Sequence, residues 1–156
     1  MKRGSTLFLK GVIALIGCIV LAVCVFVLPQ VVMAELAGDF DYAPILIGLY
    51  VPAIPFFFAL FQAVRLLTYI EQNKAFSLLS VTALNKIKYS ALAIAALFSG
   101  GMPYVFYVAD RDDAPGLVAL GLVIIGASLV IATAGALFQS LVQNAVDIKS
   151  ENDLTV

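Results

Sequence analysis

The sequence contains few residues that could do chemistry, and it contains no histidine. It therefore lacks the commonest metal ligand and the commonest general base near neutral pH. Its densest set of oxygen ligands is the DRDDAPG motif at 110–116, which lacks the glycine position and the terminal glutamate of a calcium-binding loop. A capping role is the simpler interpretation: Asp112 or Asp113 would accept amides at a helix start, with Pro115 in the first turn. We predict no catalytic, cofactor or metal site.

Polar side chains near the ends of two apolar segments form a second candidate. Gln62 and Arg65 share a helix face, as do Gln139, Gln143 and Asp147 at spacings of four. Polar groups at this depth of a membrane helix often face the interior and interact, so an Arg65–Asp147 pair ringed by glutamines is one hypothesis. The alternative is that Arg65 snorkels to the lipid headgroups. The candidate polar cluster is Gln62, Arg65, Gln139, Gln143 and Asp147.

The end of the chain, 147–156, changes from apolar to polar. Its composition is that of a disordered, solvated tail. The closing triplet is β-prone, so a strand-forming ligand for a cytosolic partner is the alternative. The candidate partner-binding residues are Ser150, Glu151, Asn152, Asp153, Leu154, Thr155 and Val156.

The elements that position these groups follow from composition. Of the 156 residues, 63% are hydrophobic and only 12% are charged, and the mean hydropathy is +1.07. Soluble domains carry about 25% charged residues, so most of this surface must face lipid. Four uncharged stretches each reach the length of about 20 residues that a membrane-spanning helix needs. The sequence predicts a single domain over 1–156, an all-α integral membrane four-helix bundle with spans at about 8–28, 44–68, 88–108 and 115–145.

Basic residues predict the orientation of these spans. One side carries eight of them, namely Lys2, Arg3, Lys10, Arg65, Lys74, Lys86, Lys88 and Lys149. The opposite side carries only Arg111. Because cytoplasmic loops are enriched in Lys and Arg, we expect both termini and the middle loop in the cytoplasm, with the chain in the plasma membrane.

Small residues predict how the helices pack, because they allow close approach in lipid. Stripes at spacings of four occur in three spans: Ala14, Cys18 and Ala22; Ala91, Ala95 and Ser99; and Ser128, Ala132, Ala136 and Ser140. We expect these stripes to face the interior of the bundle. Pro52, Pro55 and Pro103 lie in the outer halves of two spans, where kinks either open a cavity to the outside or let the helices splay.

Three segments resemble a family. PFFFALFQAVRLL–YIEQNKAFS at the second span, ADRDDAPG before the fourth and the closing NAVDIKSENDLTV are similar to a bacterial family of four-helix membrane proteins catalogued as a domain of unknown function. Members are commonly encoded beside a small helix-turn-helix regulator of the Cro/C1 type. The resemblance thus implies a membrane partner for a DNA-binding protein and raises the case for a binding role of the tail.

The expected function is therefore a binding or regulatory membrane protein whose partners are the lipid bilayer and a cytosolic helix-turn-helix regulator, with a homo-oligomer as a further option. Direct nucleic-acid binding is not expected, because the net charge is −1 and no basic face exists. A small transporter and an immunity or stress-resistance protein are the alternatives. The mid-span regions lack the acidic residues that proton-coupled export uses, and we expect no enzyme activity.

Overall fold

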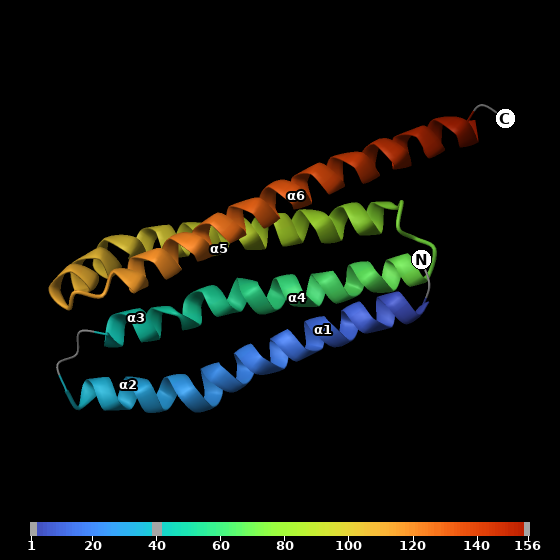
Figure 1. Ribbon diagram of the computed structural model, residues 1–156. Coiled ribbons are helices and arrows are strands. Elements are labelled where there is room, and N and C mark those ends of the chain that lie inside the picture. Colours follow the sequence, from blue (N-terminus) through green and yellow to red (C-terminus); the bar gives the residue numbers. More distant parts are fainter. Residues whose placement is uncertain (1–2, 39–41, 155–156) are drawn as a thin grey trace.

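The computed structural model describes residues 3–38 and 42–154, which form an all-α membrane protein. In chain order the elements are α1 (Arg3–Ala22), a π-helical turn (Val23–Val27), α2 (Leu28–Leu36), α3 (Ala43–Gly48), α4 (Tyr50–Glu71), α5 (Leu78–Arg111) and α6 (Pro115–Leu154). Figure 1 shows the long helices side by side, with the start of α1 and the last turns of α6 at the same end of the molecule. We call this end the terminal end, and the opposite end, where α2–α3 and α5–α6 connect, the hairpin end.

Four helical segments are long and apolar enough to cross a membrane, as predicted. They run over Gly4–Leu36, Ala43–Glu71, Leu78–Arg111 and Pro115–Leu154, and all extend beyond the predicted spans. The 40 residues of α6 correspond to about 60 Å at 1.5 Å per residue. The hydrocarbon core is about 30 Å thick, so α6 must extend past it.

The first span continues through Pro29, where the uncharged run was expected to stop. A proline in an α-helix lacks the N–H of the ladder and clashes with the carbonyl four residues before it. Here the helix widens into the π-turn Val23–Val27, and the Leu28 N–H donates to the Val23 carbonyl, five residues back. The wider turn lets the chain pass the proline and continue as α2.

The second span is interrupted once, between Gly48 and Tyr50. Pro44 lies in the first turn of α3, where a proline costs little. Pro52 would clash with the carbonyl of Gly48, which is where α3 ends. The predicted distortion of this span therefore appears as a break between α3 and α4. In contrast, α5 remains one helix through Pro103.

The main interfaces join helices in chain order: α1 with α4, α4 with α5, and α5 with α6. The α5–α6 interface is the most extensive. Its buried residues on α6 are Gly121, Ser128, Ala132 and Gly135, and those on the middle of α5 include Ala91, Ala95 and Met102. These spacings of three, four and seven follow the 3.5-residue repeat of helices that wrap around each other.

The predicted stripes at spacings of four were therefore only partly correct. Ala91, Ala95, Ser128 and Ala132 are buried, but Ser99, Ala136 and Ser140 are exposed. Positions four apart rotate by about 40° per step around an α-helix, so a row with this spacing leaves the interface after two steps. In α1, Ala14, Cys18 and Ala22 are all exposed, although Ala14 and Cys18 line an open groove against α4 together with the half-buried Ile13 and Gly17.

Candidate functional site

The predicted polar cluster is divided between two faces of α5. Gln62 is 3% exposed on α4, and with Arg65 it lines a small cavity against Lys86 of α5. Gln139 of α6 instead donates from Nε2 to the Oδ1 atom of Asn85 on α5, at 3.3 Å. Because α5 lies between α4 and α6, these two polar groups meet different sides of it.

Arg65 and Asp147 do not form the ion pair that was one hypothesis; the described part of the chain holds no such contact. Asp147 accepts a hydrogen bond from Gln143 Nε2 at 3.0 Å, one turn earlier on α6. The Arg65 side chain is exposed and lies between two rings of its own helix, with Cζ 5.8 Å from the centre of Phe61 and 6.0 Å from that of Tyr69. This position fits the alternative, in which Arg65 extends toward the headgroups.

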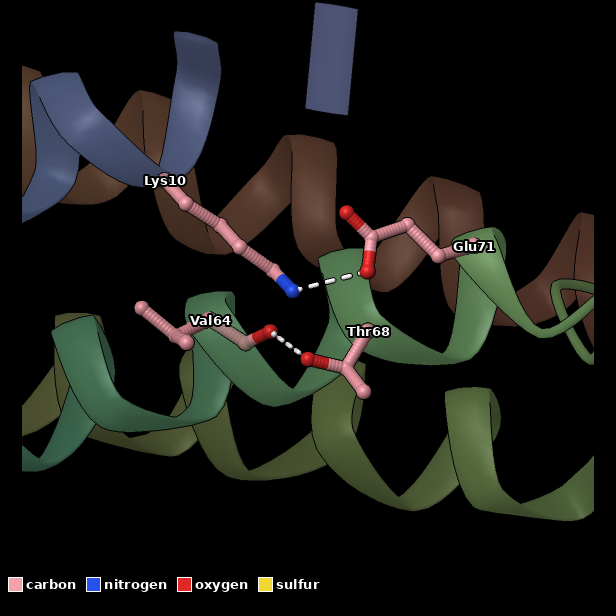
Figure 2. Close-up of polar contacts among 4 residues, drawn as sticks. All are labelled: Lys10, Val64, Thr68 and Glu71. Atoms are coloured by element: carbon pink, nitrogen blue, oxygen red, sulfur yellow. Dashed lines mark hydrogen bonds and ion pairs between the residues drawn. The ribbon is translucent and has the colours of Figure 1, made fainter. Parts of the chain in front are cut away.

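An ion pair that the sequence did not predict joins α1 to α4. Lys10 Nζ lies 2.9 Å from Glu71 Oε2, and the two side chains are only 24% and 21% exposed. Figure 2 shows the Lys10 side chain reaching across to α4, where Thr68 donates to the Val64 carbonyl at 3.0 Å. Glu71 is the single acidic residue between positions 42 and 109, and this isolation is the signal that could have identified it as a partner for a basic residue.

A second contact joins these helices near the hairpin end. Tyr50 donates from its hydroxyl to the Cys24 carbonyl at 2.8 Å. In an α-helix this carbonyl would accept from Leu28, but the Leu28 N–H is used by Val23. In a π-helix it would accept from residue 29, which is proline and has no N–H. Tyr50 thus supplies the hydrogen bond that the chain of α1 and α2 cannot provide.

The contact between Gln139 and Asn85 is incomplete. The Oε1 atom of Gln139 is buried and has no hydrogen-bond partner. Buried polar atoms are usually paired, so this amide is the polar group of the α5–α6 interface with an unused acceptor. It lies on the terminal half of the bundle, as predicted for the polar cluster.

The tail is helical, which corrects the expectation of disorder for the part that is described. α6 continues without interruption to Leu154, because extending an existing helix costs far less than starting one. Residues 150–154 are all exposed, while Thr155 and Val156 lie outside the described residues. The last turns of α6 and the α4–α5 connection enclose a groove of about 340 Å³, lined by Phe76, Ser77, Val146, Lys149, Ser150, Asp153 and Leu154.

The hairpin end holds a cavity of a different kind. About 370 Å³ are enclosed between α3, α4, α5 and α6, with Pro44, Pro52, Phe98, Met102 and Gly121 among the lining residues. The prolines were expected either to open a cavity or to let the helices splay, and a cavity is present here. Its lining is almost entirely apolar, so it offers space but little means of recognising a polar ligand.

The acidic connection at the hairpin end fits the prediction in one part: Pro115 begins α6, but the aspartates do not cap it. In the described region, no backbone N–H at the start of α6 donates to the side chain of Asp112 or Asp113; instead, Asp113 takes a left-handed backbone conformation, with φ of 51°. Aspartate tolerates this conformation better than most residues, and it lets the chain reverse from α5 to α6. The described residues also contain no group of three or more acidic or cysteine side chains placed to hold a metal ion.

Comparison with known proteins gives a family and a relative. The family described as "Protein of unknown function (DUF2975)" matches residues 31–156, a region that begins within α2 and includes α3 to α6. The chain is 54% identical, over 160 residues and the full length of both proteins, to the "Uncharacterized membrane protein YoaS" of Bacillus subtilis (strain 168). No solved structure matches. The family resemblance expected from the sequence is confirmed, and this chain belongs to the DUF2975 family of proteins.

Proposed function

We propose that this membrane protein is a binding or regulatory partner of a cytosolic protein, and that its terminal end faces the cytoplasm of the bacterial cell. The orientation is supported by the basic residues, eight of which flank the spans on the terminal side. The opposite connections carry Asp110, Asp112 and Asp113 with a single arginine.

The groove at the terminal end is the main support for a binding site for a cytosolic protein. Phe76 is 65% exposed and Leu154 is 84% exposed, although both lie beyond the uncharged segments that the bilayer covers. Exposed apolar side chains beside charged ones are typical of protein interaction sites. Lys149 and Asp153 supply charge of both signs at the edge of the same groove, which suits a partner surface better than a lipid tail.

The family resemblance suggests the partner, a helix-turn-helix regulator of the Cro/C1 type. Such a regulator would contact DNA itself, so the membrane chain needs no basic face of its own. A regulator held at the membrane would be less available to bind DNA. The groove and the tail residues 150–156 form the proposed contact surface.

The orientation is tested by cysteine labelling in intact cells. Cys18 and Cys24 are first replaced by alanine, and a single cysteine is introduced as Ser150→Cys or Asp112→Cys. A membrane-impermeant maleimide should label position 112 in intact cells and position 150 only after permeabilisation. The reverse pattern would place the terminal end outside and remove the basis for a cytosolic partner.

The binding site is tested by crosslinking in native membranes and mass spectrometry of the captured proteins. The full chain should capture a cytosolic DNA-binding protein, and the combined substitution of Phe76 and Leu154 by alanine should abolish the capture. Leu120→Ala is the matched control, because Leu120 is an exposed leucine of the same helix within the membrane-spanning part. Undiminished capture by a chain that lacks 150–156 would contradict a role for the tail.

The apolar cavity at the hairpin end favours a second candidate, a small transporter or a stress-resistance protein for apolar compounds. Its volume of about 370 Å³ is within the range of small-molecule pockets. Uptake of an apolar dye into proteoliposomes, blocked by the cavity-filling substitution Gly101→Phe, would support this candidate over the first. Equal dye uptake with and without the protein would exclude it.

A further inference from the structure

The small cavity between α4 and α5 lies at the level where the bilayer gives way to water. Arg65 follows an uncharged stretch over 42–64, and Lys86 and Lys88 precede another over 89–109. Each stretch approximates the 20 or so residues that cross the hydrocarbon core. Arg65 on α4 and Lys86 on α5 therefore reach the same depth, that of the headgroup phosphates.

The cavity brings these two cations together. It has a volume of about 80 Å³ and is lined by Gln62, Arg65 and Tyr69 of α4 and by Leu79, Thr82, Ala83 and Lys86 of α5. Since about 10–15 Å³ of such space is enough for one water, the cavity has room for a group the size of a phosphate.

The charges in and around the cavity are not balanced by the protein. In the described part of the chain, the one carboxylate nearby on α4, Glu71, is paired with Lys10. Lys88 lies with its Nζ atom 4.7 Å from the ring centre of Tyr89. Neither Arg65 nor Lys86 has an ion-pair partner among the residues described. Two basic residues thus line one cavity, and within the described ranges 3–38 and 42–154 neither is paired with a carboxylate.

The site also holds its donors in place. The rings of Phe61 and Tyr69 flank the Arg65 guanidinium, which reduces the conformational freedom that it would lose on binding. Gln62 is 3% exposed and adds an amide at the wall of the cavity. Thr82 donates its hydroxyl to the Leu78 carbonyl, so it contributes an acceptor and no donor.

We propose that this cavity, formed by Gln62, Arg65, Tyr69 and Lys86, binds a phosphate oxyanion, as carried by the headgroup of an anionic phospholipid. Arg65 supplies paired N–H donors suited to phosphate oxygens, and Lys86 supplies a second positive charge. Two uncompensated cations favour a lipid of net negative charge over a zwitterionic one. The proposal does not depend on the cytosolic partner.

The test measures lipids retained by the purified full chain in detergent, using native mass spectrometry with phosphatidylglycerol and phosphatidylcholine as probes. The full chain should bind phosphatidylglycerol in preference to phosphatidylcholine. The variant with Arg65→Gln and Lys86→Gln should bind phosphatidylglycerol about tenfold more weakly, because it loses charge-assisted hydrogen bonds. The control Lys74→Gln removes a positive charge from the same end but outside the cavity, and it should bind like the full chain.

Two further arms complete the test. Lys86→Gln alone leaves the Arg65 ring contacts intact, so it should weaken binding severalfold even if the double variant does not fold. Added inorganic phosphate that displaces the lipid would show that a free phosphate also fills the site, whereas retained lipid would restrict the site to headgroups. Equal binding of the two lipids by the full chain, or undiminished binding by Lys86→Gln, would overturn the proposal.

Discussion

The two outer helices of this protein are held in different ways. α6 packs on α5 along an extensive seam of small buried residues, among them Ala95, Ser128 and Ala132. α1 makes far less contact with α4. Polar contacts join the first span to the second instead, among them the Lys10–Glu71 ion pair at one end and, toward the other, the hydrogen bond from Tyr50 to the Cys24 carbonyl of the π-turn.

The two interfaces illustrate two ways in which a membrane helix is stabilised against its neighbour. Lipid tails are as apolar as leucine, so helices in a membrane gain stability from close packing and from polar contacts rather than from the hydrophobic effect. Close packing holds α6 as far as Gly135, and the proposed partner groove lies on its last turns beyond this seam. The family match, which begins at residue 31, covers α6 and its seam but not α1. Because α1 packs less extensively on α4 than α6 does on α5, we expect α1 to move more easily.

The largest effect should come from disturbing the α5–α6 seam. Ala132 is 5% exposed at the seam, so Ala132→Leu should lower the free energy of unfolding by about 2 kcal/mol through overpacking. Ala136, one turn later, is exposed, and Ala136→Leu should be tolerated. Unfolding in mixed detergent micelles measures both. Equal losses for the two variants would contradict the 3.5-residue seam.

A smaller effect is expected at the Lys10–Glu71 pair. A double-mutant cycle with Lys10→Gln and Glu71→Gln should give a coupling of about 1 kcal/mol, since the pair is partly buried but lies near the headgroup region. Lys74→Gln, at an exposed position of the α4–α5 connection, serves as the charge control. A coupling of zero would mean that packing alone holds this end of α1.

The smallest effect should come from Tyr50. Tyr50→Phe removes the hydrogen bond to the Cys24 carbonyl, and such bonds in membrane proteins are worth about 0.6 kcal/mol. In a Pro29→Ala background the new N–H of residue 29 can serve this carbonyl, so Tyr50→Phe should then cost almost nothing. Tyr107→Phe, at an exposed tyrosine, gives the baseline. If the cost of Tyr50→Phe is the same in both backgrounds, the carbonyl is not what Tyr50 satisfies.

Much of the fold was predictable because hydrophobic length and charge report directly on the bilayer. The four spans and the burial of Ala91, Ala95 and Ala132 followed from such local signals. The order of packing did not, because no sequence pattern states that α5 lies between α4 and α6. An Arg65–Asp147 pair would require α4 and α6 to be neighbours, but α5 lies between them.

The sequence predicted which end of the molecule holds the polar groups, but not which residues they contact. Gln62 and Arg65 do face a neighbouring helix or the headgroups, and Gln139 does meet a polar partner. The partners on α5 are Asn85, which contacts Gln139, and Lys86, which lines the cavity of Gln62 and Arg65. Their short polar run in the sequence did not indicate these contacts. The helical tail was missed because its composition describes an isolated segment, whereas the actual tail extends a helix that is already formed.

Distances between spin labels on the two helix pairs distinguish polar attachment of α1 from packing of α6. In a cysteine-free background, one labelled pair is Leu15→Cys with Phe58→Cys on α1 and α4, and the other is Leu92→Cys with Leu129→Cys on α5 and α6; all four positions are exposed. Combining Lys10→Gln with Tyr50→Phe should broaden the α1–α4 distance distribution and leave the α5–α6 distribution narrow. Unchanged distributions for both pairs, or equal broadening of both, would contradict the claim that polar contacts hold α1 while packing holds α6.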